Sequence, residues 1–168
     1  MTTTIRGSDN FDTGESRIRS GAVQSASGQT ELLFSSIPSW ARRIKVVFNG
    51  ISTAGTSSML VQLGVGVQQS SGYESTGVYV AATVSPVTST SGFICGGAGA
   101  SNVYSGAFTI DLVDGFDYVA SISGRATALG AVAGGGRVTL SGTADMIRFT
   151  TNTGADTFDA GSVNVSWE

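Results

Sequence analysis

The sequence predicts an all-β fold, an antiparallel β-sandwich of jelly-roll-like type with an extended amino-terminal arm. First, β-branched residues dominate the apolar set, which favours pleated sheet over helix. Second, charged residues make up only 12% of the 168 residues, so the polarity comes mainly from Ser and Thr, without the high net charge of disordered chains. Third, short apolar runs separated by turn residues recur about every 8–15 residues, a spacing typical of sandwiches and jelly rolls.

The chain divides into two expected parts. Residues 1–28 are polar and interrupted by glycine, so we expect an extended arm that becomes ordered on contact with neighbouring molecules. Ile5, Phe11 and Ile18 are bulky apolar residues in this segment, and we expect them to anchor it as an attachment arm. Residues 29–168 are expected to form the β-sandwich.

Local patterns predict the strands in order. The run at residues 31–34 is short and is ended by Pro38, because proline cannot donate a ladder hydrogen bond. Residues 43–51 alternate with apolar side chains on both faces, which predicts a central strand. The pair Asp114-Gly115 is a strong hairpin signal, and the glycines at 134–136 are expected to precede a strand. Further strands are expected at residues 60–67, 78–84, 92–95, 107–113, 118–123, 137–140, 146–151 and 162–167.

Composition excludes several classes of function. The net charge of −3 and the pI near 4.8 give no attraction for phosphate backbones, so we expect no nucleic-acid partner. No run of 18 apolar residues is present, which argues against membrane insertion, and the amino terminus does not have the pattern of a secretion signal. The chain has no histidine, and its single Cys95 is expected to be a buried thiol. We therefore expect no enzyme, no cofactor and no metal.

The pattern D-x-F-D occurs at residues 9–12, at 156–159 and, within a shorter match, at 114–117. Aspartates accept hydrogen bonds from nearby backbone N–H groups, and the phenylalanine would attach each turn to the core. The alternative is a calcium site, since Ca²⁺ takes oxygen ligands. The three copies lack the D-x-D-x-D-G spacing of calcium loops, which favours the turn interpretation.

Aromatic residues in expected loops are the candidates for ligand binding. Sugar rings stack on Tyr or Trp, while amide, carboxylate and hydroxyl groups hold their hydroxyls. Tyr73 and Glu74 in the expected loop at 68–77, and Asn102 beside Tyr104, fit this description. The alternative for both tyrosines is a place in the core or in an interface.

Other side chains give weaker indications. Trp40 is expected to be a structural plug with an arginine stacked on it, and Trp167 is expected to be part of the core. Paired carboxylates for glycoside hydrolysis are a further possibility, but no spacing brings two acidic residues to one face of one strand.

Residues 37–53 read I-P-S-W-A-R-R-I-K-V-V-F-N-G-I-S-T. This segment resembles the signature I-P-S-W-A-K-R-I-(T/K)-V-(M/L)-F-N-G-V-S-T of carboxy-terminal regions of tailed-bacteriophage tail fibre and tail spike proteins. Residues 60–64, followed by Gly72-Tyr73, are similar to the next strand and loop of that family. Residues 156–165 resemble its closing T-D-T-F-D-A-G-S-I-N-I. Order and spacing agree over about residues 29–168.

The resemblance implies a distal β-sandwich domain, usually trimeric, that contacts the bacterial surface without catalysis. It leads us to expect a homotrimer in the virion, at the distal part of the tail fibre. The arm would join it to the tail or baseplate, and the sandwich would bind host cell-surface glycan. The chain departs from the family in being short, so the alternative is a purely structural capsid-decoration or baseplate protein that binds no host. A depolymerising enzyme is the last alternative.

Overall fold

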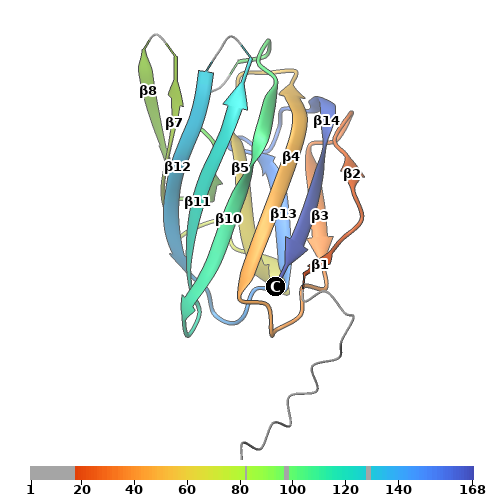
Figure 1. Ribbon diagram of the computed structural model, residues 1–168, viewed down its shortest axis with the longest axis vertical. Coiled ribbons are helices and arrows are strands. Elements are labelled where there is room, and N and C mark those ends of the chain that lie inside the picture. Colours follow the sequence, from red (N-terminus) through yellow and green to blue (C-terminus); the bar gives the residue numbers. More distant parts are fainter. Residues whose placement is uncertain (1–17, 82, 97–98, 128–129) are drawn as a thin grey trace, which may run out of the picture.

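The protein is described by a computed structural model over residues 18–81, 83–96, 99–127 and 130–168 (Figure 1). Two antiparallel sheets pack against each other, and no helix occurs among these residues. The predicted all-β sandwich is therefore confirmed. The strands run along the long axis of the molecule, so their ends and the connecting loops gather at two opposite ends (Figure 1).

The larger sheet contains nine strands within the described residues, in the order β1-β14-β4-β10-β11-β12-β7-β8, with β2 also paired to β14. Its strand β4 lies between β14 and β10, which confirms the central position predicted for residues 43–51. The members are β1 (Arg19–Ser20), β2 (Gln24–Ser25), β4 (Arg43–Thr53), β7 (Glu74–Val80), β8 (Val84–Ser89), β10 (Tyr104–Asp114), β11 (Asp117–Ala126), β12 (Gly130–Thr139) and β14 (Phe158–Trp167).

The smaller sheet has the order β3-β13-β5-β6, and β9 also pairs with β5. Its strand at residues 146–151 coincides with the prediction. The members are β3 (Glu31–Ser35), β5 (Met59–Val65), β6 (Val67–Gln68), β9 (Phe93–Ile94) and β13 (Met146–Thr151).

Two strand predictions were wrong in position. The expected strand at 78–84 is instead a hairpin, with β7 ending at Val80 and β8 beginning at Val84. The glycines at 134–136 lie inside β12, not before it. A Cβ atom on Gly134 would come within 2.5 Å of the Thr76 carbonyl oxygen, so the neighbouring strand approaches too closely for a side chain. Glycine is rare in strands, so the local sequence pattern did not reveal that these three glycines belong to β12.

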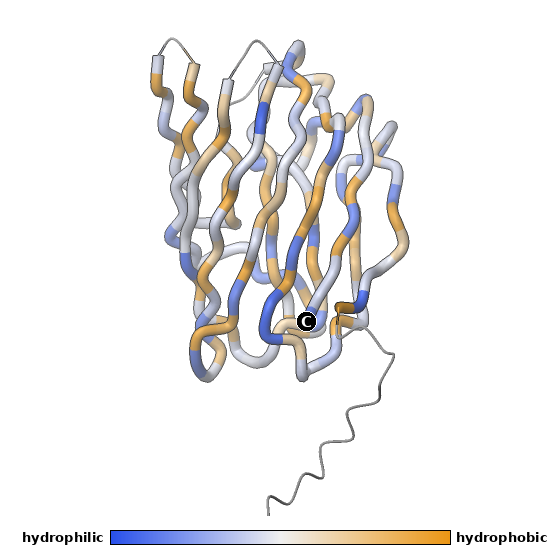
Figure 2. Tube along the Cα trace, viewed as in Figure 1, coloured by the Kyte–Doolittle hydropathy of each residue, from blue (hydrophilic) through white to orange (hydrophobic). Residues whose placement is uncertain are grey.

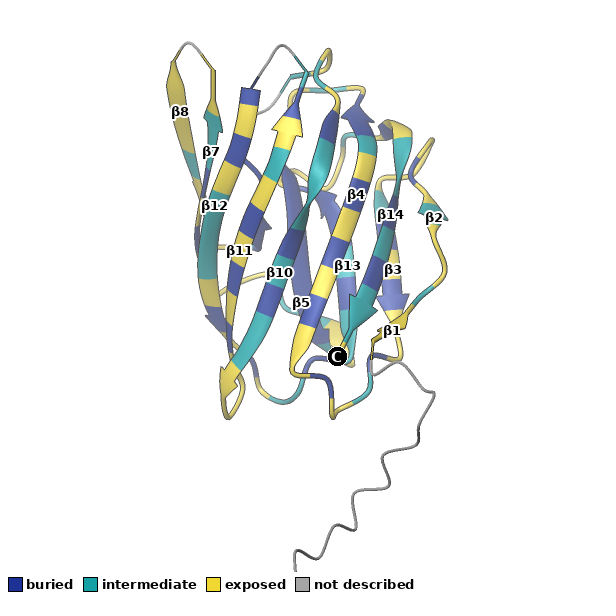
Figure 3. Cartoon of the chain, in the orientation of Figure 1, coloured by how far each residue is buried: buried dark blue, intermediate teal, exposed yellow. Residues whose placement is uncertain are grey.

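The core lies between the sheets and is rich in aromatic rings. Hydrophobic residues occur along the strands of both sheets (Figure 2). Along β4, Ile44, Val46 and Phe48 are buried while the residues between them are exposed, which gives the alternating stripes of Figure 3. The Phe48 ring lies 6.0 Å from that of Phe149 on β13, and Phe149 lies 5.4 Å from Phe158 on β14. These contacts join the two sheets, and each such pair contributes about 0.5–1.5 kcal/mol beyond burial.

A glycine contact changes which residues face the core in β4 and β14. Gly50 and Gly161 both have positive φ, 67° and 98°, and a Cβ atom on Gly161 would lie 2.6 Å from the Gly50 backbone. The pairing of the two strands shifts register on both sides of Ala160. As a result, Phe158 and Val163 are both buried although they are five positions apart, an odd spacing that would place them on opposite faces of a regular strand.

The described part of the expected arm belongs to the larger sheet. Strands β1 and β2 both pair with β14, and the amide of Gly28 donates to the Phe158 carbonyl at 2.7 Å. The β-sandwich therefore begins before residue 29, because residues 19–25 already contribute two strands to it. Ile5 and Phe11 lie outside the described residues.

The D-x-F-D turns have different surroundings. Asp156 accepts a hydrogen bond from the Ser57 amide at 2.9 Å, and Phe158 is fully buried, as the turn interpretation predicted. Asp114 accepts from the Gly115 amide at 2.8 Å, but Phe116 is 44% exposed, so the expected attachment to the core is wrong for this copy. The copy at residues 9–12 lies outside the description.

We predict that Gly161→Ala destabilises the protein by about 2–4 kcal/mol, because it adds both left-handed strain and a clash with Gly50. Gly154→Ala is the matched control, since Gly154 also has positive φ, 68°, but a methyl group added there would meet no atom within 4 Å. The control should cost about 1–2 kcal/mol. Urea denaturation measures both values, and equal losses would contradict the role given to the contact.

Candidate binding site

Tyr73 is a core residue, so its expected place as an exposed sugar platform was wrong. Its side chain is 1% exposed, and its ring meets that of Phe93 edge-on at 5.1 Å. The hydroxyl accepts a hydrogen bond from the Leu63 amide at 2.8 Å, at a point of β5 between the stretches that pair with β9 and β6. Burial raises the pKa of Tyr73 to about 12. The phenol thus takes the place of a strand partner in the smaller sheet.

Tyr104 and Asn102 do contact each other, but the tyrosine ring faces the interior. Tyr104 is 4% exposed, and its hydroxyl accepts a hydrogen bond from Nδ2 of Asn102 at 3.2 Å. Burial raises the pKa of Tyr104. This tyrosine also cannot present its ring to a sugar, and the alternative of a core position holds for both tyrosines.

Glu74 is exposed at the start of β7 and is paired with Arg137 on β12. The guanidinium donates to both carboxylate oxygens, at 3.0 and 2.8 Å, and this pairing lowers the pKa of Glu74. Strand register aligns Glu74 with Arg43, whereas Tyr104 lies opposite Ile51 toward the other end of the sheet. The four sequence-predicted site residues therefore do not form one site.

The two tryptophans differ in burial, and the cysteine is enclosed by the core. Trp40 is 52% exposed in the turn after β3, so its expected role as a structural plug was wrong. Trp167 is partly buried and packs against the core, as expected. Cys95 is fully buried, as predicted, and burial raises the pKa of its thiol.

The outer face of the larger sheet, which we define as its side chains pointing away from the smaller sheet, is made largely of short residues. Strand register places one row of it across seven neighbouring strands, and most members of this row carry a hydroxyl group. The row runs through Ser166, Lys45, Thr109, Ser121, Gly135, Thr76 and Thr88. Adjacent strands are about 4.8 Å apart, so the row spans roughly 29 Å.

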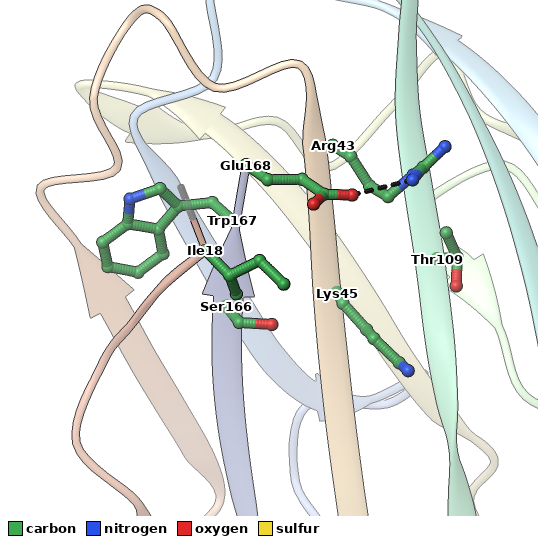
Figure 4. Close-up of a pocket in the computed structure, with 7 residues that line it drawn as sticks. All are labelled: Ile18, Arg43, Lys45, Thr109, Ser166, Trp167 and Glu168. Atoms are coloured by element: carbon green, nitrogen blue, oxygen red, sulfur yellow. Dashed lines mark hydrogen bonds and ion pairs between the residues drawn. The ribbon is translucent and has the colours of Figure 1, made fainter. Parts of the chain in front are cut away.

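A hollow of about 300 Å³ lies at one end of this row, where β14, β4 and β10 meet the start of β1 (Figure 4). In Figure 4, Ile18 points toward β4 from one side, while Lys45 extends toward β10. We call this feature the Lys45 hollow. It is lined by Ile18, Arg43, Lys45, Thr109, Ser166, Trp167 and Glu168.

Arg43 holds the acidic groups at the edge of the hollow. Its Nε atom lies 2.7 Å from Oδ1 of Asp111, and its Nη1 atom lies 2.7 Å from Oε1 of Glu168. Hydrogen bonds to these two carboxylates raise the pKa of Arg43. Pairs this exposed contribute little to stability.

Lys45 is the cation of the hollow that has no such partner. Its ammonium group makes no hydrogen bond and no ion pair with any described residue, although it lies one row from Arg43. Three N–H donors are therefore free, with the hydroxyl-bearing residues Thr109 and Ser166 on either side in register. This arrangement suits an acceptor-rich ligand.

The sequence patterns did not predict this site. They selected Ile18 only as an arm anchor, whereas the structure places Ile18 on the wall of the hollow. They missed Lys45, Thr109 and Ser166. The alternation of residues 43–51 already placed Lys45 away from the core, but pairing with residues more than 60 positions away has no local signal.

A second hollow of about 290 Å³ is lined by residues 67–71 with Val65 and Ser141, and contains no charged residue. Its Gln69 amide already donates to the Ser71 and Thr139 carbonyls. Over the described ranges, no three His, Cys, Asp or Glu side chains gather closely enough to hold a metal ion. A search of the same ranges found no helix with the length and apolar character needed to cross a membrane.

Comparisons of the chain with models of known protein families, with curated proteins and with solved structures found no match. The geometry of the outer face and the sequence resemblance are therefore the features that point to a function.

We predict that Tyr73→Phe destabilises the protein by about 1–3 kcal/mol, because the Leu63 amide is left buried without an acceptor. Tyr79→Phe is the control, since the Tyr79 hydroxyl donates to the Thr127 carbonyl at 3.2 Å from a partly buried site. It should cost less. Chemical denaturation provides the measurement, and an unchanged stability of Tyr73→Phe would refute the structural role of the hydroxyl.

Proposed function

We propose that this chain is a bacteriophage tail fibre protein, a structural component of the virion that binds host surface polysaccharide through its β-sandwich. Residues 1–28 would attach it to the tail or baseplate. The observation that carries the binding part is the outer face, a wide and rigid surface of short hydroxyl-bearing side chains with a hollow at one end. The assignment to a tail fibre rests on the sequence resemblance.

Two of the segments that carry the sequence resemblance lie side by side in the larger sheet. Residues 37–53 include β4, residues 156–165 include most of β14, and the two strands pair. Gly50 lies against Gly161, and the Ser52 hydroxyl donates to Asp159. Residues that match the signature thus contact one another across the two strands, as expected if the signature specifies the fold. This supports a shared sandwich, while ligand specificity would depend on the exposed positions around it.

Binding without catalysis is the activity that the hollow supports best. Both of its carboxylates, Asp111 and Glu168, are held by Arg43 at 2.7 Å. They are exposed, and no apolar enclosure surrounds either of them to hold a proton for general acid catalysis. The hollow opens on the surface of a rigid sheet and so suits a polymer that passes across it.

The opposite end of the outer face supports the homotrimer that we include in the proposal. Val80 is 37% exposed and Val84 62% exposed, next to Ala131, Ala133 and Pro86. Apolar groups of this size are suited to mutual burial between copies. The same patch would also suit a neighbouring capsid or baseplate protein, and this favours the purely structural virion protein as the second candidate.

We predict that the purified protein binds saturably to susceptible bacterial cells, and that soluble surface polysaccharide from those cells competes for binding. A strain that lacks the polysaccharide is the control. Fluorescently labelled protein and cell-associated fluorescence provide the measurement. The absence of saturable binding would reject host recognition and leave the purely structural virion protein.

We further predict that the protein has three times the 17.0 kDa mass of one chain in solution. Val84→Lys should lower this mass, because it places a charge in the apolar patch. Val113→Lys is the matched control, at a valine 66% exposed in the β10–β11 hairpin, and should leave the mass unchanged. Sedimentation equilibrium measures both, and a monomeric wild type would contradict the trimer.

A further inference from the structure

We infer that the Lys45 hollow binds a sugar unit that carries a carboxylate, such as a uronic acid in an acidic polysaccharide. The inference rests on the proposed function and specifies the class of glycan. Its starting point is Lys45, whose ammonium group has no described partner in a hollow of about 300 Å³. A hollow of this size accommodates one sugar ring together with part of the next.

The charge arrangement around Lys45 favours a carboxylate over a neutral group. Asp111 and Glu168 lie in the neighbouring row, where Arg43 holds both of them at 2.7 Å. Neither makes an ion pair with Lys45. On the other side of Lys45, the next row contains Val47, Ala107 and Asn164, which have no charge. A ligand carboxylate can bind Lys45 from this side without approaching another anion.

The surrounding groups favour a sugar over an acidic peptide. Thr109 and Ser166 lie on the strands on either side of Lys45, so each is about 4.8 Å from it across the sheet. The two hydroxyl-bearing residues are thus about 9.6 Å apart across β4, a span that would reach hydroxyls of neighbouring sugar units on either side of the bound carboxylate, and Ile18 adds an apolar wall for a C–H face. The hollow lies on the face of the sheet, between strands that are already paired, so a peptide could not add to it as a further strand.

The net charge of the whole protein increases the selectivity for a site with an unpaired cation. Its net charge is −3, so an acidic polymer is repelled on average and binds only where a local cation is free. On the outer face, Arg43 and Arg137 are both paired with carboxylates. Arg125, one further unpaired cation of this face among the described residues, lies on β11, two strands from β4. It provides a matched control for a purely electrostatic effect.

The test uses the full chain and trisaccharides of galacturonic, glucuronic and mannuronic acid, each with its neutral counterpart. Calorimetry should detect binding of at least one acidic trisaccharide, tighter than its neutral counterpart. Lys45→Met keeps the apolar stem and should weaken this binding by at least about tenfold, as expected for the loss of a charge-assisted hydrogen bond. Lys45→Arg should keep most of it, and Arg125→Met should change it less than twofold. Amide shifts in NMR spectra should centre on residues 45, 109 and 166.

Three results would overturn the inference. One is equal binding of the neutral sugars with no effect of Lys45→Met, and another is equal loss with Arg125→Met. The third is binding of tri-glutamate as tight as that of the best acidic sugar. If no trisaccharide binds while the protein still adsorbs to susceptible cells, the inference fails and the proposed function stands. If adsorption is absent as well, both fail.

Discussion

The pairing of β4 with β14 is the constraint on which the rest of the molecule depends. It joins a strand from the first third of the chain to the last strand, and it passes through the contact of Gly50 with Gly161. The same ladder places Ser166 beside Lys45 and brings Glu168 to Arg43. A shift of one residue would turn each of these side chains to the other face of the sheet. The core and the hollow are therefore fixed by one register.

The register shift at the contact of Gly50 with Gly161 makes this pairing compatible with a continuous core. In β4, Phe48 and Ile51 are both buried, so the inward side changes from even to odd positions near Gly50. The change in β14 lies opposite, between Phe158 and Val163. Two glycines in the left-handed region allow the ladder to continue on both sides of the change. The aromatic contacts of Phe48 and Phe158 with Phe149 then stabilise the result.

Local patterns predicted what alternation and turn residues can specify, and failed where a partner lies far along the chain. They identified the strand at 146–151, the Asp114-Gly115 hairpin and the central place of β4. They placed Tyr73 correctly in a loop before β7 but expected its ring to be exposed. Its burial depends on Leu63 and Phe93, which reach it only through the tertiary fold. The neighbours of Lys45 belong to two other strands, and no periodicity within β4 reveals them.

The short side chains of the outer face bear on how a sugar would be bound. Ser and Thr on a paired strand have few rotamers to lose, so contacts with them cost little conformational entropy. Lys45 has a long flexible side chain, and ordering it offsets part of what its charge contributes, up to about 2 kcal/mol. A single hollow would therefore discriminate acidic from neutral sugars, but its affinity for either would be low. In the proposed trimer, three hollows that bind one repeating polysaccharide would raise the overall affinity, because each bound unit raises the effective concentration of the next.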